Sequence, residues 1–242
     1  MNFNFLKFRP HKQSTLTWRQ ILPNLITSGN TACGMTSLIL TLHGNYTAAG
    51  WVLFLAVCFD FMDGFVARWV GGGTQFGLEF DSLSDVVSFC AAPSFLFYCV
   101  YMQSMGIMSI IVSCLFLLCG ALRLARYNIV HVSGYFQGMP VPAGGLFLVS
   151  FVVAGVTLNQ YIAAFLALLM SAIMVSSIRY SNIKALKKGY VRKARLTFLL
   201  LLMISIIVFG KVFAPMILMS IYVVSGLLNF DWGKWLEFPI PE

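Results

Sequence analysis

The stretch DFMDGFVARWVGGGTQFGLEFDSLSD, residues 60–85, decides how this chain folds. It contains five of the eight acidic residues of the whole protein, although the sequence on either side is apolar enough to lie in a membrane. Its four aspartates are Asp60, Asp63, Asp81 and Asp85. A carboxylate in apolar surroundings is costly and marks a candidate functional site. Four together repel one another unless protons or cations neutralise them, so the stretch predicts a cation site.

Composition places the chain among integral membrane proteins. Of its 242 residues, 59% are hydrophobic and 10% are charged, and its mean hydropathy is +0.85, values typical of a membrane protein. The net charge of +8 could indicate a nucleic acid partner. The basic residues occupy short loops between apolar segments, however, which favours contact with anionic lipid headgroups, and we expect no nucleic acid partner. The six cysteines form no C-x-x-C pair, so they predict neither a disulfide framework nor a zinc site.

Apolar segments long enough for membrane-spanning helices recur along the chain. A helix needs about 20 residues to cross roughly 30 Å of hydrocarbon. Because the last four candidates are short or closely spaced, the sequence predicts an all-α bundle of six to eight transmembrane helices, with eight as the best count. The candidate spans are 21–43, 47–70, 81–103, 105–126, 142–158, 160–178, 196–210 and 212–229.

The basic residues predict how the bundle is oriented. Lys and Arg precede the first span, close the second and the fourth, and fill the segment between the sixth and the seventh, whereas Lys211 alone of the 16 falls on the other side. Positive residues favour the cytoplasmic side, so we expect a multi-pass protein of the cell (inner) membrane with both termini in the cytoplasm. The predicted organisation is a basic cytoplasmic segment at 1–20, a transmembrane domain at 21–229 and a cytoplasmic tail at 230–242.

Helical spacing gathers the aspartates into two polar stripes. Residues three or four apart share a face of a helix, and both stripes follow this spacing. The first consists of Asp60, Asp63, Gly64, Ala67 and Arg68, and the second of Gly77, Asp81 and Asp85.

Packing the two stripes together would surround one small cavity with four carboxylates. Two divalent ions roughly 3.5–4 Å apart could lie there and assist a phosphoryl transfer. Gly64 and Gly77 would permit close approach of a helix or ligand, and Arg68 could pair with a phosphate oxygen. A lone intramembrane aspartate could instead join two helices or line an ion path. Four aspartates in this spacing favour a catalytic site.

The pattern D-G-x2-A-R-x8-G-x3-D-x3-D, with a further aspartate three residues before its first one, resembles the signature of the CDP-alcohol phosphotransferases. Every fixed position is present. The resemblance implies an enzyme that displaces CMP from a CDP-linked lipid with an alcohol, using Mg²⁺ or Mn²⁺, and it suggests a homodimer. It implies that Asp60, Asp63 and Asp81 bind metal, and that Asp85 is the general base and also touches metal. It also implies a CDP site lined by Asp60, Gly64, Ala67, Arg68 and Gly77.

Further segments resemble the bacterial and archaeal phosphatidylserine synthases within that family. These are 80–93, 122–128 and 136–144, together with Pro23-Asn24 and residues 30–34 of the first span. Cys90 stands where a glycine is expected. The resemblance implies CDP-diacylglycerol and L-serine as substrates, phosphatidylserine and CMP as products, and a role in phospholipid biosynthesis. It leaves open whether the lipid is a diacylglycerol or its archaeal ether analogue.

A basic pair offers a physical basis for a serine acceptor. Arg123 and Arg126 lie three residues apart at the cytoplasmic end of the fourth span, where they could hold a carboxylate, and Asn128 could add a hydrogen bond. Both arginines could instead anchor the helix at the interface or bind lipid phosphate. Glycerol 3-phosphate also attracts cations, and inositol is a third candidate acceptor. The arginines alone therefore do not identify the alcohol.

Three polar residues, Asn24, Thr27 and Asn30, repeat every third position inside the first span. They could form hydrogen bonds between helices or reach the cytidine, and the sequence does not separate the two.

A different class of function is a cation transporter, since intramembrane carboxylates also mark ion paths. An enzyme would release CMP from CDP-diacylglycerol only with an alcohol and a divalent ion, whereas a transporter would not consume the nucleotide.

Overall fold

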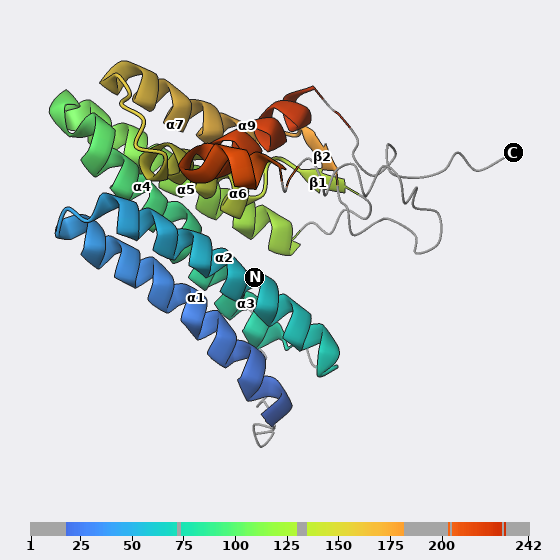
Figure 1. The fold of residues 1–242 in the computed structure, drawn as a ribbon. Coiled ribbons are helices and arrows are strands. Elements are labelled where there is room, and N and C mark those ends of the chain that lie inside the picture. The colour runs from blue at the N-terminus through green and yellow to red at the C-terminus, as the bar shows by residue number, and fades with distance from the viewer. Residues whose placement is uncertain are drawn as a thin grey trace, which may run out of the picture.

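The computed structural model of the chain is a bundle of helices (Figure 1). It describes residues 18–71, 74–129, 135–181, 203, 205–228 and 230. The predicted N-terminal segment 1–20 and tail 230–242 fall almost entirely outside the described residues, as do residues 196–202 and 204 of the predicted span 196–210. Apart from one short two-stranded ladder, the described elements are helical. The predicted all-α class is therefore confirmed.

The described elements follow one another along the chain, and those from α3 to η3 form one continuous helix. Their bounds are α1 (Trp18–Leu42), α2 (Tyr46–Trp69), α3 (Gln75–Asp85), the π-helix η1 (Val86–Ala91), α4 (Ala92–Phe97), the π-helix η2 (Tyr98–Met102), the 3-10 turn η3 (Gln103–Met105), α5 (Ile107–Ile129), β1 (Tyr135–Gln137), α6 (Val141–Val153), α7 (Gln160–Val175), β2 (Arg179–Ser181), the 3-10 turn η5 (Lys211–Phe213) and α9 (Ala214–Leu227).

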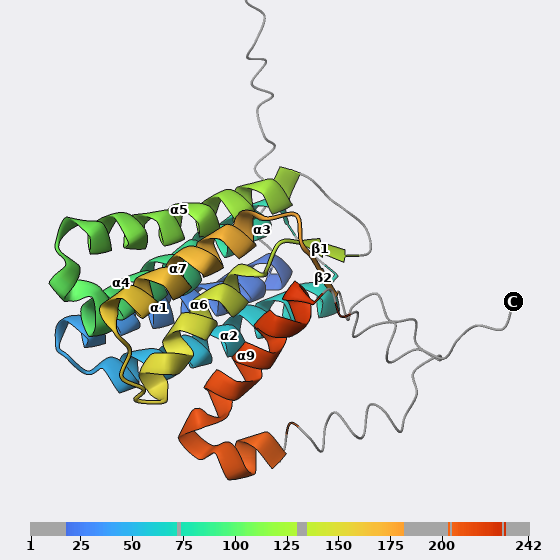
Figure 2. The ribbon, with the colours of Figure 1, turned by 90° about the horizontal axis from the view of Figure 1, so that it is seen from above.

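Five helical stretches of the described chain are long and apolar enough to cross a membrane. They are Ile21–Leu42, Tyr46–Trp69, Gln75–Met105, Ile107–Ile129 and Ser205–Leu227, and two shorter apolar helices are α6 and α7. The last long stretch changes direction at η5, where Lys211 has a positive φ of 45° (Figure 2). This is the position of the turn expected between the predicted seventh and eighth spans.

The third span begins six residues earlier than the sequence predicts. Residue 81 was the expected start, but helical structure is continuous from Gln75 to Met105. Thr74 explains the earlier start, because its side chain accepts a hydrogen bond from the backbone N–H of Gly77 at 3.0 Å and so caps α3. The polar residues of the first turns lower the local hydropathy, so an apolar span is not predicted to begin there. The second aspartate stripe therefore lies on one continuous helix.

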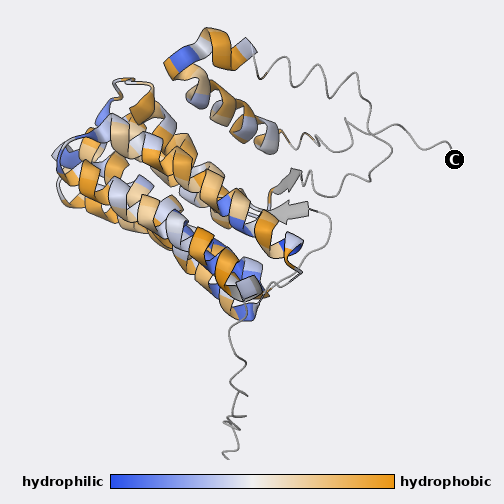
Figure 3. Ribbon diagram, turned by 60° about the horizontal axis from the view of Figure 1, so that its bottom comes forward, coloured by the Kyte–Doolittle hydropathy of each residue, from blue (hydrophilic) through white to orange (hydrophobic). Residues whose placement is uncertain are grey.

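Connections gather at two ends of the bundle (Figure 1). The turns between α1 and α2, between η3 and α5, and between α6 and α7 lie at one end, whereas α2 leads into α3 at the other. The short ladder of β1 and β2 lies at this second end as well. Hydrophilic residues concentrate toward the ends of the helices and hydrophobic ones between them (Figure 3).

The core lies where α4 meets the helices around it. Phe89, Phe97 and Phe116 are fully buried there, together with Leu148 and Met170. Many large hydrophobic side chains of the outer helix faces are exposed instead, such as those of α1 and α5. Exposed apolar faces on long helices match a hydrocarbon environment rather than water.

Gly138 lies in the short connection between β1 and α6. Its φ is +73°, its N–H donates to the carbonyl of Ile178 at 2.9 Å, and a Cβ added there would collide with the backbone carbonyl of Met174. Both the backbone conformation and the space therefore require glycine at this position.

Gly138→Ala should lower the thermal stability of the detergent-solubilised protein by about 5 °C, because strain and a backbone collision together cost about 1–3 kcal/mol. Thermal unfolding monitored by size-exclusion recovery measures the shift. Gly44→Ala is the matched control, because Gly44 also has a positive φ, of 77°, but lies in open space. An equal shift in both variants would contradict the assigned collision.

Candidate active site

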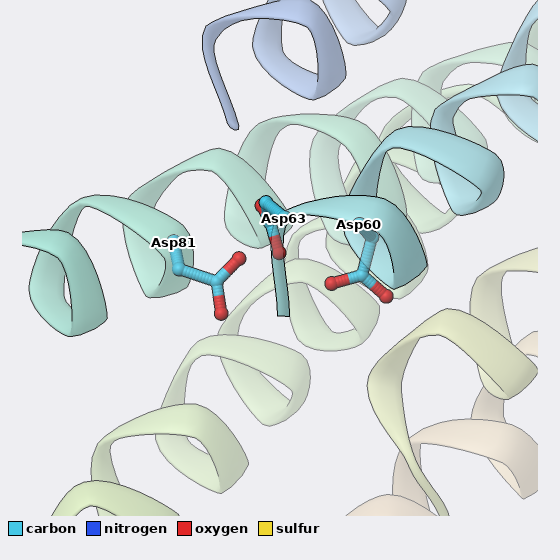
Figure 4. Close-up of side chains that lie close together, drawn as sticks. All are labelled: Asp60, Asp63 and Asp81. Atoms are coloured by element: carbon cyan, nitrogen blue, oxygen red, sulfur yellow. The ribbon is translucent and has the colours of Figure 1, made fainter. Parts of the chain in front are cut away.

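Three carboxylates of α2 and α3 converge at the second end of the bundle. Asp60 and Asp63 come from α2 and Asp81 from α3, and one oxygen of each lies within 4.8 Å of the others (Figure 4). Asp63 is buried, and the other two are partly buried. The two polar stripes therefore face each other as the helical spacing predicts.

Polar side chains of a third helix, α1, form hydrogen bonds with Asp63 and with the fourth aspartate, Asp85. The hydroxyl of Thr27 donates to Asp63 Oδ2 at 2.7 Å, and the amide of Asn30 donates to Asp85 Oδ1 at 3.1 Å. Thr27 and Asn30 are themselves buried. Of the two alternatives for this stripe, the structure shows the inter-helix hydrogen bonds for Thr27 and Asn30. Asn24 instead lines the adjoining cavity.

A second pair of polar side chains joins α1 to α3 nearby. The hydroxyl of Thr31 donates to the hydroxyl of Ser84 at 2.7 Å, and Ser84 donates in turn to the carbonyl of Phe80. Neither residue was singled out from the sequence, because hydroxyls one turn apart are common in apolar helices. Their bond brings α1 and α3 together without touching an aspartate.

A cavity of about 440 Å³ opens beside the carboxylates. Of the five residues that the family resemblance implies for a CDP site, four line it, namely Gly64, Ala67, Arg68 and Gly77. Its other lining residues are Pro23, Asn24, Thr27, Asp63, Thr74, Gln75, Leu78 and Asp81. A Cβ on Gly77 would lie 3.1 Å from Asn24 Oδ1, so this glycine allows α1 and α3 to approach closely. Asp60, the fifth, is absent from this lining, and Asp63 lies between it and Asp81 (Figure 4).

The donor set suits hard divalent cations. Three carboxylates offer oxygen ligands in one place, and Asp81 Oδ1 is buried without a hydrogen-bond partner among the described residues. Carboxylate oxygens are the ligands that Mg²⁺ and similar ions prefer. Asp85 lies outside this three-carboxylate group, with one oxygen bonded to Asn30. The group therefore fits a metal, and Asp85 has a separate place beside it.

Comparison with known proteins identifies this arrangement. The profile of the CDP-alcohol phosphatidyltransferase family matches residues 20–170, which include nearly all of α1, the whole of α2 and α3, and every residue of the cavity lining. The chain belongs to this family. The resemblance that the aspartate motif carries is thus confirmed, and members of this family generally use divalent metals.

Named relatives extend the similarity beyond the motif. The chain is 35% identical over 200 residues to a CDP-diacylglycerol–serine O-phosphatidyltransferase of Methanocaldococcus jannaschii, covering 82% of this chain and 90% of that protein. It is 32% identical over 223 residues to a protein of the same name from Helicobacter pylori, covering 87% and 91%. An archaetidylserine synthase of Methanothermobacter thermautotrophicus is 39% identical over 165 residues, covering 67% and 70%.

The three residues predicted to bind the acceptor lie in different surroundings in this phosphatidyltransferase. Arg126 is exposed and donates to the carbonyl of Val175 at 2.9 Å, so it ties α5 to the end of α7. Asn128 donates to Ser82 at 3.0 Å and ties α5 to α3. Each therefore has a helix-joining contact that requires no ligand.

Arg123 differs from its two neighbours. Only 8% of its surface is exposed, its Nε has no hydrogen-bond partner among the described residues, and its guanidinium carbon lies 5.9 Å from the centre of the Tyr127 ring. It also interacts electrostatically with Asp85 and with Tyr222 of α9. Of the three predicted acceptor residues, Arg123 is the one that is buried and interacts electrostatically with Asp85.

Several residues of the site escaped the sequence analysis. Thr74, Gln75 and Leu78 line the cavity, and Tyr222 of the last helix interacts electrostatically with Arg123. Such residue types occur throughout membrane helices, and nothing in their spacing separates them from lipid-facing positions. Thr74 alone carried a signal, since a threonine followed by a helical stripe is a typical helix start.

Asp81→Asn should weaken Mn²⁺ binding to the detergent-solubilised protein by about tenfold or more, because it removes one of three converging negative ligands. Electron paramagnetic resonance of free Mn²⁺ measures the binding. Glu79→Gln is the matched control, since Glu79 lies on the same helix and is exposed outside the group. Equal Mn²⁺ affinity of Asp81→Asn and the unmodified protein would remove Asp81 from the metal site.

Proposed function

We propose that this protein transfers the phosphatidyl group of CDP-diacylglycerol to the hydroxyl of L-serine and releases CMP. The family supplies the reaction type, and the aspartate group with its adjoining cavity supplies a place for it. The archaeal ether counterpart of the lipid remains a second candidate donor, because one of the relatives is named for an archaetidyl product.

The acceptor follows from the relatives. Proteins with serine in their names align over about nine-tenths of their own length, so the similarity includes the helices beyond the metal-binding motif. The relatives named for different lipids share this acceptor. This agreement is the observation that supports serine as the acceptor in preference to glycerol 3-phosphate or inositol.

The cavity suits the nucleotide end of the donor lipid. Gly64, Ala67 and Gly77 keep its walls free of bulky side chains, while Arg68 can pair with a phosphate oxygen. The cavity lies at an end of long apolar helices, so the acyl chains can remain in the bilayer while the CDP group reaches water. Asn24 lies at the wall where the cytidine would enter.

Divalent ions, Mg²⁺ or Mn²⁺, held by Asp60, Asp63 and Asp81 would neutralise the pyrophosphate and the charge that develops on the leaving CMP. Thr27 orients Asp63 for this task through its hydrogen bond to Oδ2. Hydrogen-bonded ligands are held in one orientation, which preserves the geometry of a metal site.

Asp85 would act as the general base. The serine hydroxyl oxygen attacks the β-phosphorus, its new P–O bond forms, and the bond from that phosphorus to the bridging pyrophosphate oxygen breaks. CMP leaves with the bridging oxygen, and the hydroxyl proton passes to Asp85. Asn30 holds one oxygen of Asp85 and so fixes the plane of the carboxylate. One direct displacement requires no covalent enzyme intermediate.

The active site would face the cytoplasm. Arg68, Arg123 and Arg126 lie at the end of the bundle that contains the aspartates, whereas Lys211 lies at the opposite turn. Positive residues favour the cytoplasmic side of the cell membrane, so both termini would lie there too. We further propose a homodimer, as the family resemblance implies, which cross-linking in native membranes would detect as a doubled mass.

A parallel assay of acceptors tests the function. Purified protein should release CMP from CDP-diacylglycerol with L-serine in the presence of Mg²⁺ or Mn²⁺, and mass spectrometry should find phosphatidylserine. EDTA should stop the reaction. Product with glycerol 3-phosphate or inositol alone would replace serine as the acceptor, and absence of CMP with every acceptor would favour a cation transporter.

Asp85→Asn should lower kcat by about 100-fold or more, since general-base catalysis contributes on this order. Mn²⁺ affinity and the KM for CDP-diacylglycerol should stay close to those of the unmodified protein, because the three-carboxylate group and the cavity lining are intact. CMP release in mixed micelles measures both constants. A near-normal kcat would remove Asp85 from the role of base.

Arg123→Ala should raise the KM for serine by about tenfold or more while changing the KM for the lipid much less, because this buried guanidinium, which interacts electrostatically with Asp85, would bind the serine carboxylate. Arg126→Ala provides the comparison, since Arg126 already binds the carbonyl of Val175. If Arg123→Ala raised both Michaelis constants equally, Arg123 would have an anchoring role instead.

A further inference from the structure

The helix that carries Asp85 changes its winding immediately after this residue. Asp85 ends α3, and residues Val86–Ala91 form the π-helix η1 before α4 resumes. A π turn is wider than an α turn and is frequent at functional sites. Ser88, Phe89 and Cys90 of η1 are all buried. The wide turn therefore lies inside the bundle, directly next to the proposed base.

Glycines from three different helices contact η1. Gly34 of α1 faces Ser88, Gly120 of α5 faces Cys90, and Gly145 of α6 faces the carbonyl of Phe89. A Cβ on any of the three would come closer to η1 than real Cβ atoms do. The absence of side chains at these positions is what allows the wide turn to fit between three helices.

Hydrogen bonds connect η1 to Asp85 through one residue of α1. The hydroxyl of Ser88 donates to the backbone carbonyl of Asn30 at 2.8 Å, and the side-chain amide of Asn30 donates to Asp85 Oδ1 at 3.1 Å. Asn30 is completely buried, and Asp85 is 7% exposed. A displacement of η1 would therefore reach the carboxylate both along the helix and across this bridge.

We propose that η1, seated on the three glycines, positions Asp85 for proton transfer, and that Cys90 and Gly120 are a size-matched pair in this seat. This inference rests on the proposed function, in which Asp85 takes the proton from the acceptor. Misplacement of a reacting group by about 1 Å can lower a rate by about 100-fold. Cys90 and Ser88 are thus positioning residues, which act through Asp85 and do not touch the substrate.

Of the three glycine contacts with η1, the contact between Gly120 and Cys90 is the one that substitutions can both break and restore. A Cβ on Gly145 would meet backbone atoms of Phe89, and one on Gly34 would meet Ser88 backbone atoms as well as its hydroxyl. At Gly120 the nearest atoms are Sγ and Cβ of Cys90, which belong to a side chain that a second substitution can remove. Volume-conserving exchanges in a packed interior are tolerated best, so this contact can be broken and then restored.

The test combines Gly120→Ala, Cys90→Gly and the double variant in the full-length protein. Gly120→Ala should lower kcat for CMP release with serine by about tenfold or more, with the KM for CDP-diacylglycerol changed less than about twofold, because the cavity lining is untouched. Adding Cys90→Gly should restore kcat to within about threefold of the unmodified protein, since the added methyl then occupies the vacated volume.

Two controls separate positioning from packing. Gly145→Ala should not be rescued by Cys90→Gly, because its collision is with the backbone. Gly50→Ala places a Cβ 2.5 Å from a side-chain atom of Val153, a collision between α2 and α6 that does not involve η1. It should lower thermal stability and leave kcat within about twofold, since the base is not displaced.

A milder pair of variants decides the matter if Gly120→Ala does not fold. Ser88→Ala removes the bond to Asn30 and should lower kcat by about tenfold. Ser84→Ala removes the neighbouring bond to Thr31 between the same two helices and should leave kcat within about twofold, because that bond does not reach Asn30.

Defined results would overturn the inference. These are a normal kcat in Gly120→Ala or Ser88→Ala, a kcat loss in Gly120→Ala that Cys90→Gly fails to rescue, or an equal loss of kcat in Gly50→Ala. Each would reject positioning by η1 while phosphatidylserine synthesis by the unmodified protein still stood. Failure of the unmodified protein to make phosphatidylserine would instead reject the proposed function.

Discussion

Negative charge gathered inside an apolar bundle is the constraint on which the rest of this structure depends. Asp60, Asp63 and Asp81 bring their oxygens within 4.8 Å, and Asp85 lies buried beside them. Such charges repel one another and are costly away from water. Cations can neutralise them, and the surrounding helices supply hydrogen bonds to them. A site of this kind suits a reaction whose donor carries a pyrophosphate, which needs the same cations.

Hydrogen bonds stabilise the aspartates directly, and glycines allow the helices that carry and surround them to pack closely. Thr27 and Asn30 of α1 each donate to one aspartate, so a helix without acidic residues contributes to the site. Gly77 brings α1 close to α3, and Gly34, Gly120 and Gly145 accept the wide turn after Asp85. Small residues permit such close packing between membrane helices, where burial of apolar surface supplies little driving force. The polar site is therefore built into the packing of the bundle.

Much of the architecture could be predicted because the membrane restricts it. The lengths of the apolar segments predicted the all-α class and the ends of α2, α5 and α7 to within a few residues. The start of α3 was wrong, since the polar first turns, from Gln75 onward, do not register as a span. The predicted loop 179–195 lies largely outside the described residues, as do residues 196–202 of the span 196–210, and these parts stay predictions. The two π-helices in Gln75–Met105 left no trace in the sequence, because a single extra residue per turn does not alter hydropathy.

The sequence by itself determined the family and the residue types of the catalytic group, since the spacing of the four aspartates puts them on one face of each of two helices. Only the tertiary structure decided which neighbours hold them. It separated Arg123, which is buried and interacts electrostatically with Asp85, from Arg126 and Asn128, which join helices. It also brought Ser88, Cys90 and Gly120 into one contact network. Helical period defines a face along one segment, but the partner of that face depends on how separate helices pack, and no local pattern records it.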